Sequence, residues 1–329
     1  MTFRNFARSM RRMIWIMAAA LLSLQAIAGR PKIGLALGGG GAKGAAEVGV
    51  LKVLEEEGIE VDYIAGTSIG SIVGGLYAAG YTAAELETMF QTQEWLTLLT
   101  DRNASLSNEP YKTVDDVTYI FGFPVLDRRG GGRGLGMMRG ERIEQLLDSM
   151  LTARGGSKFK RLKTPFCCVA ANIRTAEEVV LKSGSVARAM RASMAIPGIF
   201  KPVEHDDCLL VDGGMLNNLP VDVCRQMGAD IVIAVDLEQV PKTPRKRADI
   251  SSLDMIASML GLGGILEWVT NRPDIAKHVE NVKQADIYIH PELPDADATS
   301  FGNKTAARMI VAGEQAVRKE LTKLKKLKK

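Results

Sequence analysis

The segment GLALGGGGAKGAAEVGVL, residues 34–51, joins an apolar run to a helical pattern through four consecutive glycines. The apolar run over 32–37 predicts a buried strand, and apolar residues at helical spacing predict a helix over 45–57. Glycine loses more conformational freedom on folding than any other residue. Four in a row therefore indicate that backbone amides approach another group closely at this turn.

A second strand-to-helix junction follows. Residues 61–65 are predicted to form a strand and 71–79 a helix, and between them lies the G-x-S-x-G pattern of Gly66, Ser68 and Gly70. This pattern places a serine on a sharp turn, where its hydroxyl projects and the glycines avoid clashes. The strand and helix on either side favour Ser68 as a catalytic nucleophile over a purely structural serine.

The alternation of strands and helices continues along the chain and predicts an α/β fold with a mostly parallel central sheet. Residues 103–136 interrupt it with polar loops, and RRGGGRGLG from Arg128 predicts a surface loop. Beyond Pro241 the sequence predicts a basic linker, an apolar helix over 253–269 and a last long helix. The other predicted elements are helices at 142–151 and 185–194 and strands at 166–171, 178–181, CLLVDGG and ADIVIAVDL.

The two glycine-containing junctions are expected to lie side by side, because consecutive parallel strands end at the same edge of the sheet. The amides of Gly39, Gly40 and Gly41 would then face Ser68, with the dipole of the following helix behind them. Amide donors in that place are what an acyl-transfer serine needs for the oxyanion of its tetrahedral intermediate.

A nucleotide site is the rival interpretation, because Gly39, Gly41 and Gly44 also match G-x-G-x-x-G. That fingerprint requires an acidic residue at the end of the next strand, where this chain has GTSIG. The sequence also does not match the lysine-containing pattern of a phosphate-binding loop, because Lys43 is followed by glycine rather than by serine or threonine. Nucleotide binding is therefore disfavoured.

The serine needs a base, and three histidines follow the first 28 residues. His205 lies in the charged stretch EHDDC, His278 on a predicted surface helix, and His290 ends the strand-like ADIYIH. His290 is the best triad candidate of the three, although a solvated or hydrogen-bonded histidine is the more common case for each.

An aspartate is the other candidate base. Asp212 ends an apolar strand, and Gly213 and Gly214 after it allow close approach to another loop. A carboxylate with a pKa near 4 is a poor base for an alcohol, but apolar burial raises that pKa. Asp236 also ends an apolar strand, so the residues alone leave both aspartates open.

Four motifs in order, GGGGAKG, GTSIG, ASMAIPGIF (192–200) and DGG, resemble the patatin-like phospholipases. The resemblance covers residues 31 to about 237 and implies a three-layer α/β/α fold with a Ser–Asp dyad, Ser68 as nucleophile and Asp212 as general base. It also implies that ASMAIPGIF lines the site. The reaction scheme of such a dyad needs no metal or cofactor, and the sequence shows no cluster of metal-ligand residues. The implied oxyanion and substrate-binding residues are Gly39, Gly40, Gly41, Ala42, Lys43 and Gly44, supported by Gly66, Gly70, Gly213 and Gly214.

Two positions depart from the family pattern. Many bacterial members have histidine where this chain has Glu47 and arginine where it has Lys43. Neither position is catalytic in the family, so the resemblance still implies activity.

The first 28 residues have the pattern of a secretory signal, with arginines, an apolar run over 13–28 and a terminal Ala26-Ile27-Ala28. An uncleaved anchor is the alternative. Four of the 42 basic residues lie here, so the remainder carries 38 basic and 38 acidic residues, and nucleic acid is not an expected partner. We expect an exported, periplasmic or secreted protein with a catalytic domain over 29–240. A helical region over 241–329 is expected to pack on it or extend it.

Peripheral membrane contact is suggested at two places. The apolar helix over 253–269 is either a core helix or a lipid-facing cap. The basic tail from Arg318 is either a solvated helix end or a lipid contact, with Val317, Leu321 and Leu324 at helical spacing to enter the interface.

The four cysteines, Cys167, Cys168, Cys208 and Cys224, show no metal-binding spacing and are predicted to be small buried apolar residues. Taken together, the sequence predicts a serine hydrolase of phospholipase or lysophospholipase type that acts on lipid esters without a cofactor. The alternative is a lipid-binding protein of the membrane surface that keeps the fold with little turnover.

Overall fold

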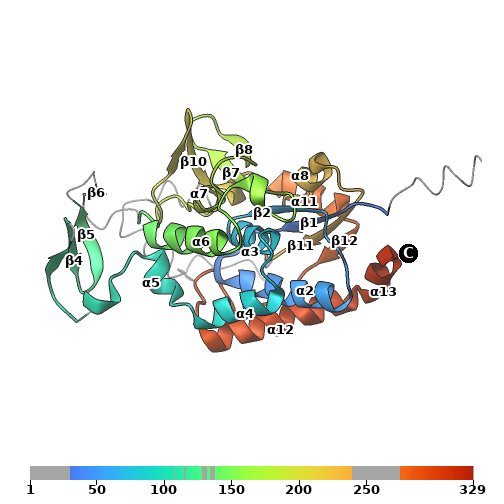
Figure 1. Cartoon of the computed structure of the whole chain (residues 1–329), viewed down its shortest axis with the longest axis horizontal. Coiled ribbons are helices and arrows are strands. Elements are labelled where there is room, and N and C mark those ends of the chain that lie inside the picture. Colours follow the sequence, from blue (N-terminus) through green and yellow to red (C-terminus); the bar gives the residue numbers. More distant parts are fainter. Residues whose placement is uncertain are drawn as a thin grey trace, which may run out of the picture. The chain divides into compact units, whose positions relative to one another are not determined.

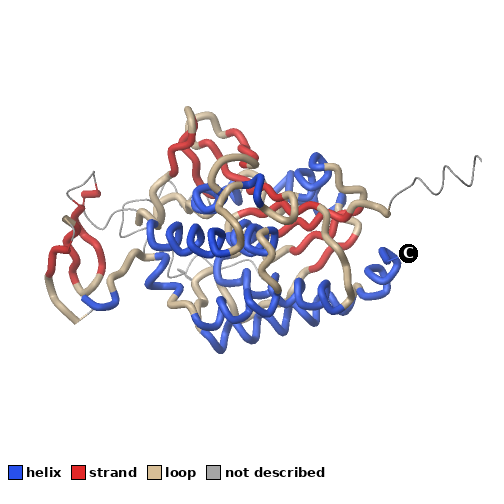
Figure 2. Tube along the Cα trace, in the orientation of Figure 1, coloured by secondary structure: helices blue, strands red, loops and turns tan. Residues whose placement is uncertain are grey.

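The computed structural model describes residues 30–106, 108–114, 116–127, 132–133, 138–238 and 275–328. The described residues between Lys32 and Lys328 belong to one compact unit (Figures 1 and 2). The predicted signal, most of the RRGGGRGLG loop, the basic linker and the apolar helix at 253–269 lie outside the described residues.

The central sheet has eight strands in the order β12-β11-β1-β2-β7-β10-β9, with β8 paired to β7. The run from β12 to β7 is parallel, whereas β8, β10 and β9 join by antiparallel pairing. The predicted mostly parallel sheet is therefore confirmed. The strands are β1 (Ile33–Leu37), β2 (Tyr63–Thr67), β7 (Phe166–Asn172), β8 (Glu177–Leu181), β9 (Val203–His205), β10 (Cys208–Asp212), β11 (Ile231–Val235) and β12 (Ile287–Ile289).

Two strands meet end to end along one edge of β7. β2 pairs with its first part, up to Thr67 opposite Val169, and β10 pairs with the rest, with Asp212 opposite Ala170. β8 pairs with β7 across both stretches and so occupies the other edge. The carboxyl ends of β2 and β10 consequently come together on neighbouring residues of β7.

Helices cover both faces of the sheet, which gives the predicted three layers (Figure 1). Side chains alternate along a strand. Leu35 and Leu37 of β1 therefore join the larger apolar cluster, whereas Ala36 joins a second cluster on the opposite face. The helices are α2 (Ala45–Glu56), α3 (Ile69–Ala78), α4 (Ala83–Thr92), α5 (Trp95–Leu99), α6 (Glu141–Ala153), α7 (Val186–Ser193), α8 (Val221–Met227), α11 (Ile275–Gln284), α12 (Asn303–Lys319) and α13 (Leu321–Leu324).

A second, antiparallel sheet lies where the sequence analysis predicted loops. Its strands are β3 (Lys112–Val114), β4 (Val117–Ile120), β5 (Phe123–Asp127) and β6 (Gly132–Arg133). Phe121 and Gly122 turn β4 into β5 with φ values of 48° and 78°. The loop prediction was wrong because strands of two to five residues are too short to show a clear alternation of apolar and polar residues.

The long helix α12 packs along α2 through two glycines. A Cβ on Gly49 would lie 1.9 Å from the carbonyl oxygen of Ile310, and a Cβ on Gly313 would lie 1.9 Å from that of Ala46. Only glycine allows the two backbones this separation, so the C-terminal helix is fitted to the first helix of the fold.

The three apolar residues predicted for the basic tail pack into the protein, Leu321 being half-buried. Val317 and Leu324 are fully buried, so the expectation that they enter a membrane interface is wrong. Arg318 pairs with Glu56 at 2.6 Å, which ties the start of the tail to α2. Among the described residues, no helix combines the length and the apolar character that a membrane span requires.

Candidate active site

Ser68 lies on a sharp turn between β2 and α3, with φ 55° and ψ −122°. A Cβ on Gly66 would lie 2.4 Å from the carbonyl oxygen of Gly70, and a Cβ on Gly70 would lie 2.4 Å from that of Leu37. Both glycines are therefore required by the close packing of the turn. A non-glycine residue with positive φ is strained, and such strain is concentrated at functional sites.

The hydroxyl of Ser68 donates a hydrogen bond to Asp212, with 2.7 Å between Oγ and Oδ2. The other carboxylate oxygen of Asp212 accepts a bond from the Gly214 amide at 2.8 Å. Gly213 makes this turn possible, because a Cβ there would lie 2.2 Å from the carbonyl oxygen of Val169. The two side chains predicted from the sequence thus meet at the junction of β2 and β10.

Burial raises the pKa of Asp212 to about 6, against the opposing effect of its hydrogen bonds from Ser68 and Gly214. Ser68 and Asp212 are each 7% exposed. The carboxylate is therefore mostly ionised at neutral pH, yet it is a stronger base than an ordinary aspartate.

The glycine loop lies against the serine. A Cβ on Gly39 would be 3.2 Å from the Cβ of Ser68 and 2.3 Å from Oδ1 of Asn218, so only glycine fits. The Gly39 amide donates to the Asn218 carbonyl at 3.1 Å, and the Ala42 amide donates to the Ala298 carbonyl at 2.9 Å. These two predicted members of the oxyanion loop are thus engaged within the protein and have no free amide to offer.

The amides that are left belong to Gly40 and Gly41, which have no protein acceptor in the part of the chain that the structure describes. Both residues are half-buried. The side chain of Lys43 donates to the Leu237 carbonyl at 2.7 Å and so holds the loop to the segment after β11. Gly44 packs on Ile69, since a Cβ there would lie 2.2 Å from Cγ1 of that residue.

None of the three histidines forms a hydrogen bond with Ser68 or Asp212. His205 lies 3.7 Å from Asp206 at the surface, and Nε2 of His278 lies 3.1 Å from the carboxylate of Asp236. Nδ1 of His290 lies 3.2 Å from the backbone carbonyl of Asp236. The choice of His290 as triad candidate was wrong, because β12 places it beside β11 rather than beside β2.

Ser193 and Asn218 are site residues that the sequence analysis did not single out. The Ser193 hydroxyl accepts a bond from the Ser68 amide at 2.9 Å and donates to the carbonyl of Val169 at 2.5 Å. It therefore fixes the serine turn to β7. The signal was present, since Ser193 belongs to the ASMAIPGIF motif, and Asn218 follows DGG in MLNNLPV.

Glu47, one of the two departures from the family pattern, is fully buried in the first turn of α2. Burial raises the pKa of the Glu47 carboxyl well above its ordinary value, against the opposing effect of a backbone hydrogen bond from Gly38.

The four cysteines are all free, and Cys208 is half-buried while the other three are buried. Their prediction as small buried residues is therefore confirmed for Cys167, Cys168 and Cys224.

Solved structures similar to this chain include VipD from Legionella pneumophila, with a TM-score of 0.46 and 16% identity over 91% of this chain and 67% of that chain. The type III effector ExoU of Pseudomonas aeruginosa gives a TM-score of 0.47 and 15% identity over 90% of this chain and 54% of that chain.

Sequence relatives include a patatin-like phospholipase domain-containing protein of Caenorhabditis elegans, 37% identical over 64% of this chain and 14% of the relative. A lysophospholipase of Mycosarcoma maydis is 37% identical over 67% of this chain and 10% of its own length. An NTE family protein of Mycobacterium tuberculosis is 32% identical over 67% of this chain and 52% of its own. The chain thus spans a small part of the first two relatives and about half of the third.

The family model described as patatin-like phospholipase matches residues 35–225. The match begins in the strand before the glycine run and includes both Ser68 and Asp212. The chain belongs to the patatin-like phospholipase family.

Proposed function

We propose that this chain is a serine hydrolase of lipid esters, of phospholipase or lysophospholipase type, with Ser68 as nucleophile and Asp212 as general base. The observation that carries the proposal is the 2.7 Å hydrogen bond from the Ser68 hydroxyl to the buried Asp212 carboxylate, on a strained turn. Family membership supports the substrate class, and a lysophospholipase stands among the relatives.

The proposed reaction needs only these two side chains and backbone amides. Ser68 Oγ attacks the acyl carbonyl as its proton passes to Oδ2 of Asp212, which is already in contact. The amides of Gly40 and Gly41 donate to the oxyanion that forms. The protonated Asp212 then gives its proton to the departing alcohol, and water hydrolyses the acyl-enzyme with Asp212 again acting as base.

The hydrogen bonds that hold Ser68 and Asp212 in place favour Asp212 as the base over a histidine. Its second oxygen is held by the Gly214 amide, so the carboxylate has one orientation and keeps Oδ2 on the serine. The Ser193 hydroxyl holds the backbone of Ser68 in the same way. Nucleophile and base are thus each fixed by a separate hydrogen bond before substrate arrives.

Labelling with a fluorophosphonate tests this function, because only an activated serine reacts with it. We expect the label on Ser68, its loss in Ser68→Ala together with lipid ester hydrolysis, and unchanged labelling in Ser149→Ala, which removes an exposed serine of α6. A folded protein that takes no label and hydrolyses no lipid ester would instead be a lipid-binding member of the family.

We also propose that the chain is exported, on the strength of the arginines, apolar run and Ala-x-Ala site within residues 1–28. Sequencing the N-terminus of the mature protein tests this, and we expect it to begin at Gly29. An intact N-terminus would favour the alternative of an uncleaved anchor.

A further inference from the structure

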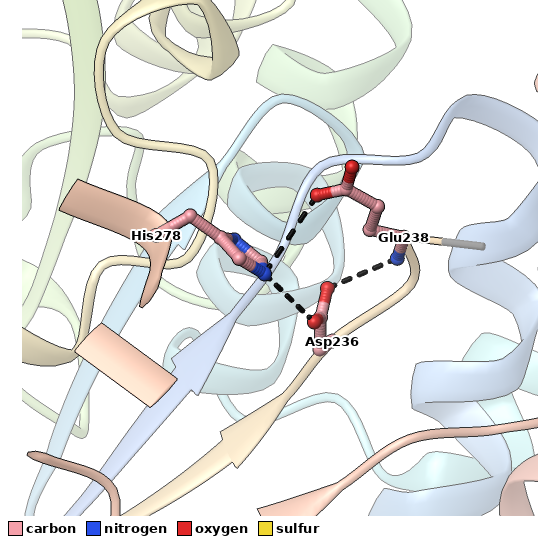
Figure 3. Close-up of side chains that lie close together, drawn as sticks. All are labelled: Asp236, Glu238 and His278. Atoms are coloured by element: carbon pink, nitrogen blue, oxygen red, sulfur yellow. Dashed lines mark hydrogen bonds and ion pairs between the residues drawn. The ribbon is translucent and has the colours of Figure 1, made fainter. Parts of the chain in front are cut away.

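Three potential metal ligands gather at the end of β11, outside the Ser68 site. Asp236 follows β11 directly, Glu238 lies two residues further on, and His278 reaches them from α11 (Figure 3). Nε2 of His278 is 3.1 Å from Oδ2 of Asp236 and 3.7 Å from Oε2 of Glu238. One ligand atom from each residue lies within 4.8 Å of the others.

These separations suit a small divalent cation. Zinc binds imidazole nitrogen and carboxylate oxygen at about 2.0–2.2 Å, and tetrahedral coordination then sets ligand atoms about 3.3 Å apart. The two nitrogen-to-oxygen separations, 3.1 and 3.7 Å, lie on either side of that value. One imidazole and two carboxylates also form a donor set that a borderline ion such as Zn²⁺ accepts.

The charge at Asp236 points the same way. Its side chain is 3% exposed, and among the described residues its ion-pair partner is His278 rather than a lysine or arginine. The backbone amide of Glu238 donates to Oδ1 at 3.0 Å, and the hydroxyl of Tyr288 donates to Oδ2 at 2.7 Å. A buried carboxylate requires a compensating charge, and a hydrogen-bond donor behind a ligating carboxylate is the usual support of a metal site.

We propose that Asp236, Glu238 and His278 bind one divalent cation of the zinc type, with Tyr288 orienting the Asp236 carboxylate. The sequence analysis expected no metal. It could not have found this cluster from spacing, because His278 lies 40 residues from Glu238.

A cation there would brace the glycine loop, because Leu237 stands between two of the ligands. A Cβ on Gly40 would lie 2.8 Å from Cβ of Leu237, and the Leu237 carbonyl accepts the bond from Lys43. Fixing the residues on both sides of Leu237 thus fixes the wall behind the Gly40 amide. This consequence, unlike the binding itself, rests on the proposed function.

Calorimetric titration of the metal-stripped full chain with Zn²⁺ tests the site. We expect one Zn²⁺ per chain. The affinity for Zn²⁺ should fall about 100-fold or more in His278→Ala, since loss of a residue that only supports a ligand already lowers metal affinity about 10–100-fold. Glu238→Gln should also weaken binding, and it decides the question if His278→Ala does not fold. Ser68→Ala should bind Zn²⁺ like the wild type, which separates the metal site from the proposed hydrolysis.

Two histidine variants serve as controls. His290→Ala alters a neighbour that is not a ligand, and His205→Ala alters a histidine paired across β9 and β10 with Cys208. Both should bind as tightly as the wild type. An absence of Zn²⁺ binding, or binding lost in His205→Ala but kept in His278→Ala, would overturn the proposed site. If Zn²⁺ binds through His278 but ester turnover is the same in the metal-stripped and the Zn²⁺-loaded chain, the site is supported and the proposed bracing of the glycine loop is refuted.

Discussion

Replacing Asp212 by asparagine should abolish turnover and at the same time stabilise the fold. Burial raises the pKa of this carboxyl from 3.8 to about 6. One pKa unit corresponds to about 1.4 kcal/mol, so keeping Asp212 ionised in the folded chain costs about 3 kcal/mol above pH 6. Because the folded-state pKa exceeds the unfolded one, the native chain binds an extra proton between pH 4 and 6. Wild-type stability therefore falls as pH rises through that window.

Asparagine removes the charge, while its side-chain oxygen can still accept the hydrogen bond from the Gly214 amide. We expect Asp212→Asn to unfold at higher urea concentration than the wild type at pH 8, by about 3 kcal/mol, and to show almost no gain at pH 4. Asp206→Asn is the matched control, because the Asp206 side chain is 89% exposed and surface changes usually stay within about 0.5 kcal/mol.

Two results would refute this reasoning. A gain of equal size at pH 4 and pH 8 would show that ionisation of Asp212 is not its source. Wild-type ester turnover in the folded variant would show that the carboxylate is not the base.

Three further outcomes are expected. Gly40→Val should lower kcat about 100-fold or more in steady-state ester assays, since the new side chain meets Leu237 and displaces an amide proposed for the oxyanion; wild-type kcat in the folded variant would remove that role. The pH profile of kcat/KM should rise through a single ionisation near pH 6, set by the pKa of Asp212, and a flat profile from pH 5 to 8 would contradict it. Leu324→Ala should lower the free energy of unfolding by about 2–5 kcal/mol in urea titrations, because Leu324 is fully buried. An unchanged urea midpoint would show that the Leu324 side chain does not contribute to the core.

The parts of the fold that the sequence predicted are those with local signals. The glycine run and GTSIG each mark a junction between an apolar strand and a helix, and β1 and β2 do pair in parallel. Their adjacency follows from that pairing, which is why Gly39 was expected near Ser68 and lies against it.

What the sequence did not predict depends on contacts between distant residues. Ser193 bonds to a residue 125 positions away, so its motif could place it near the site but could not show that its hydroxyl holds the Ser68 amide. The engaged amides of Gly39 and Ala42 likewise depend on Asn218 and Ala298, which are remote in sequence. His290 failed as a triad member for the same reason, because the edge position of β12 is a property of the whole sheet.

Because β2 and β10 meet end to end on β7, this one strand sets the distance between Ser68 and Asp212. Ser68 and Asp212 are 144 residues apart, yet their separation is set by two adjacent residues, Val169 and Ala170. Segments between them, the β3–β6 sheet included, can therefore lengthen or shorten without changing the 2.7 Å contact. A single deletion within β7 would instead shift one partner by about 3.3 Å and turn side chains to the opposite face. Insertions should thus be tolerated within the β3–β6 sheet but not within the seven residues of β7.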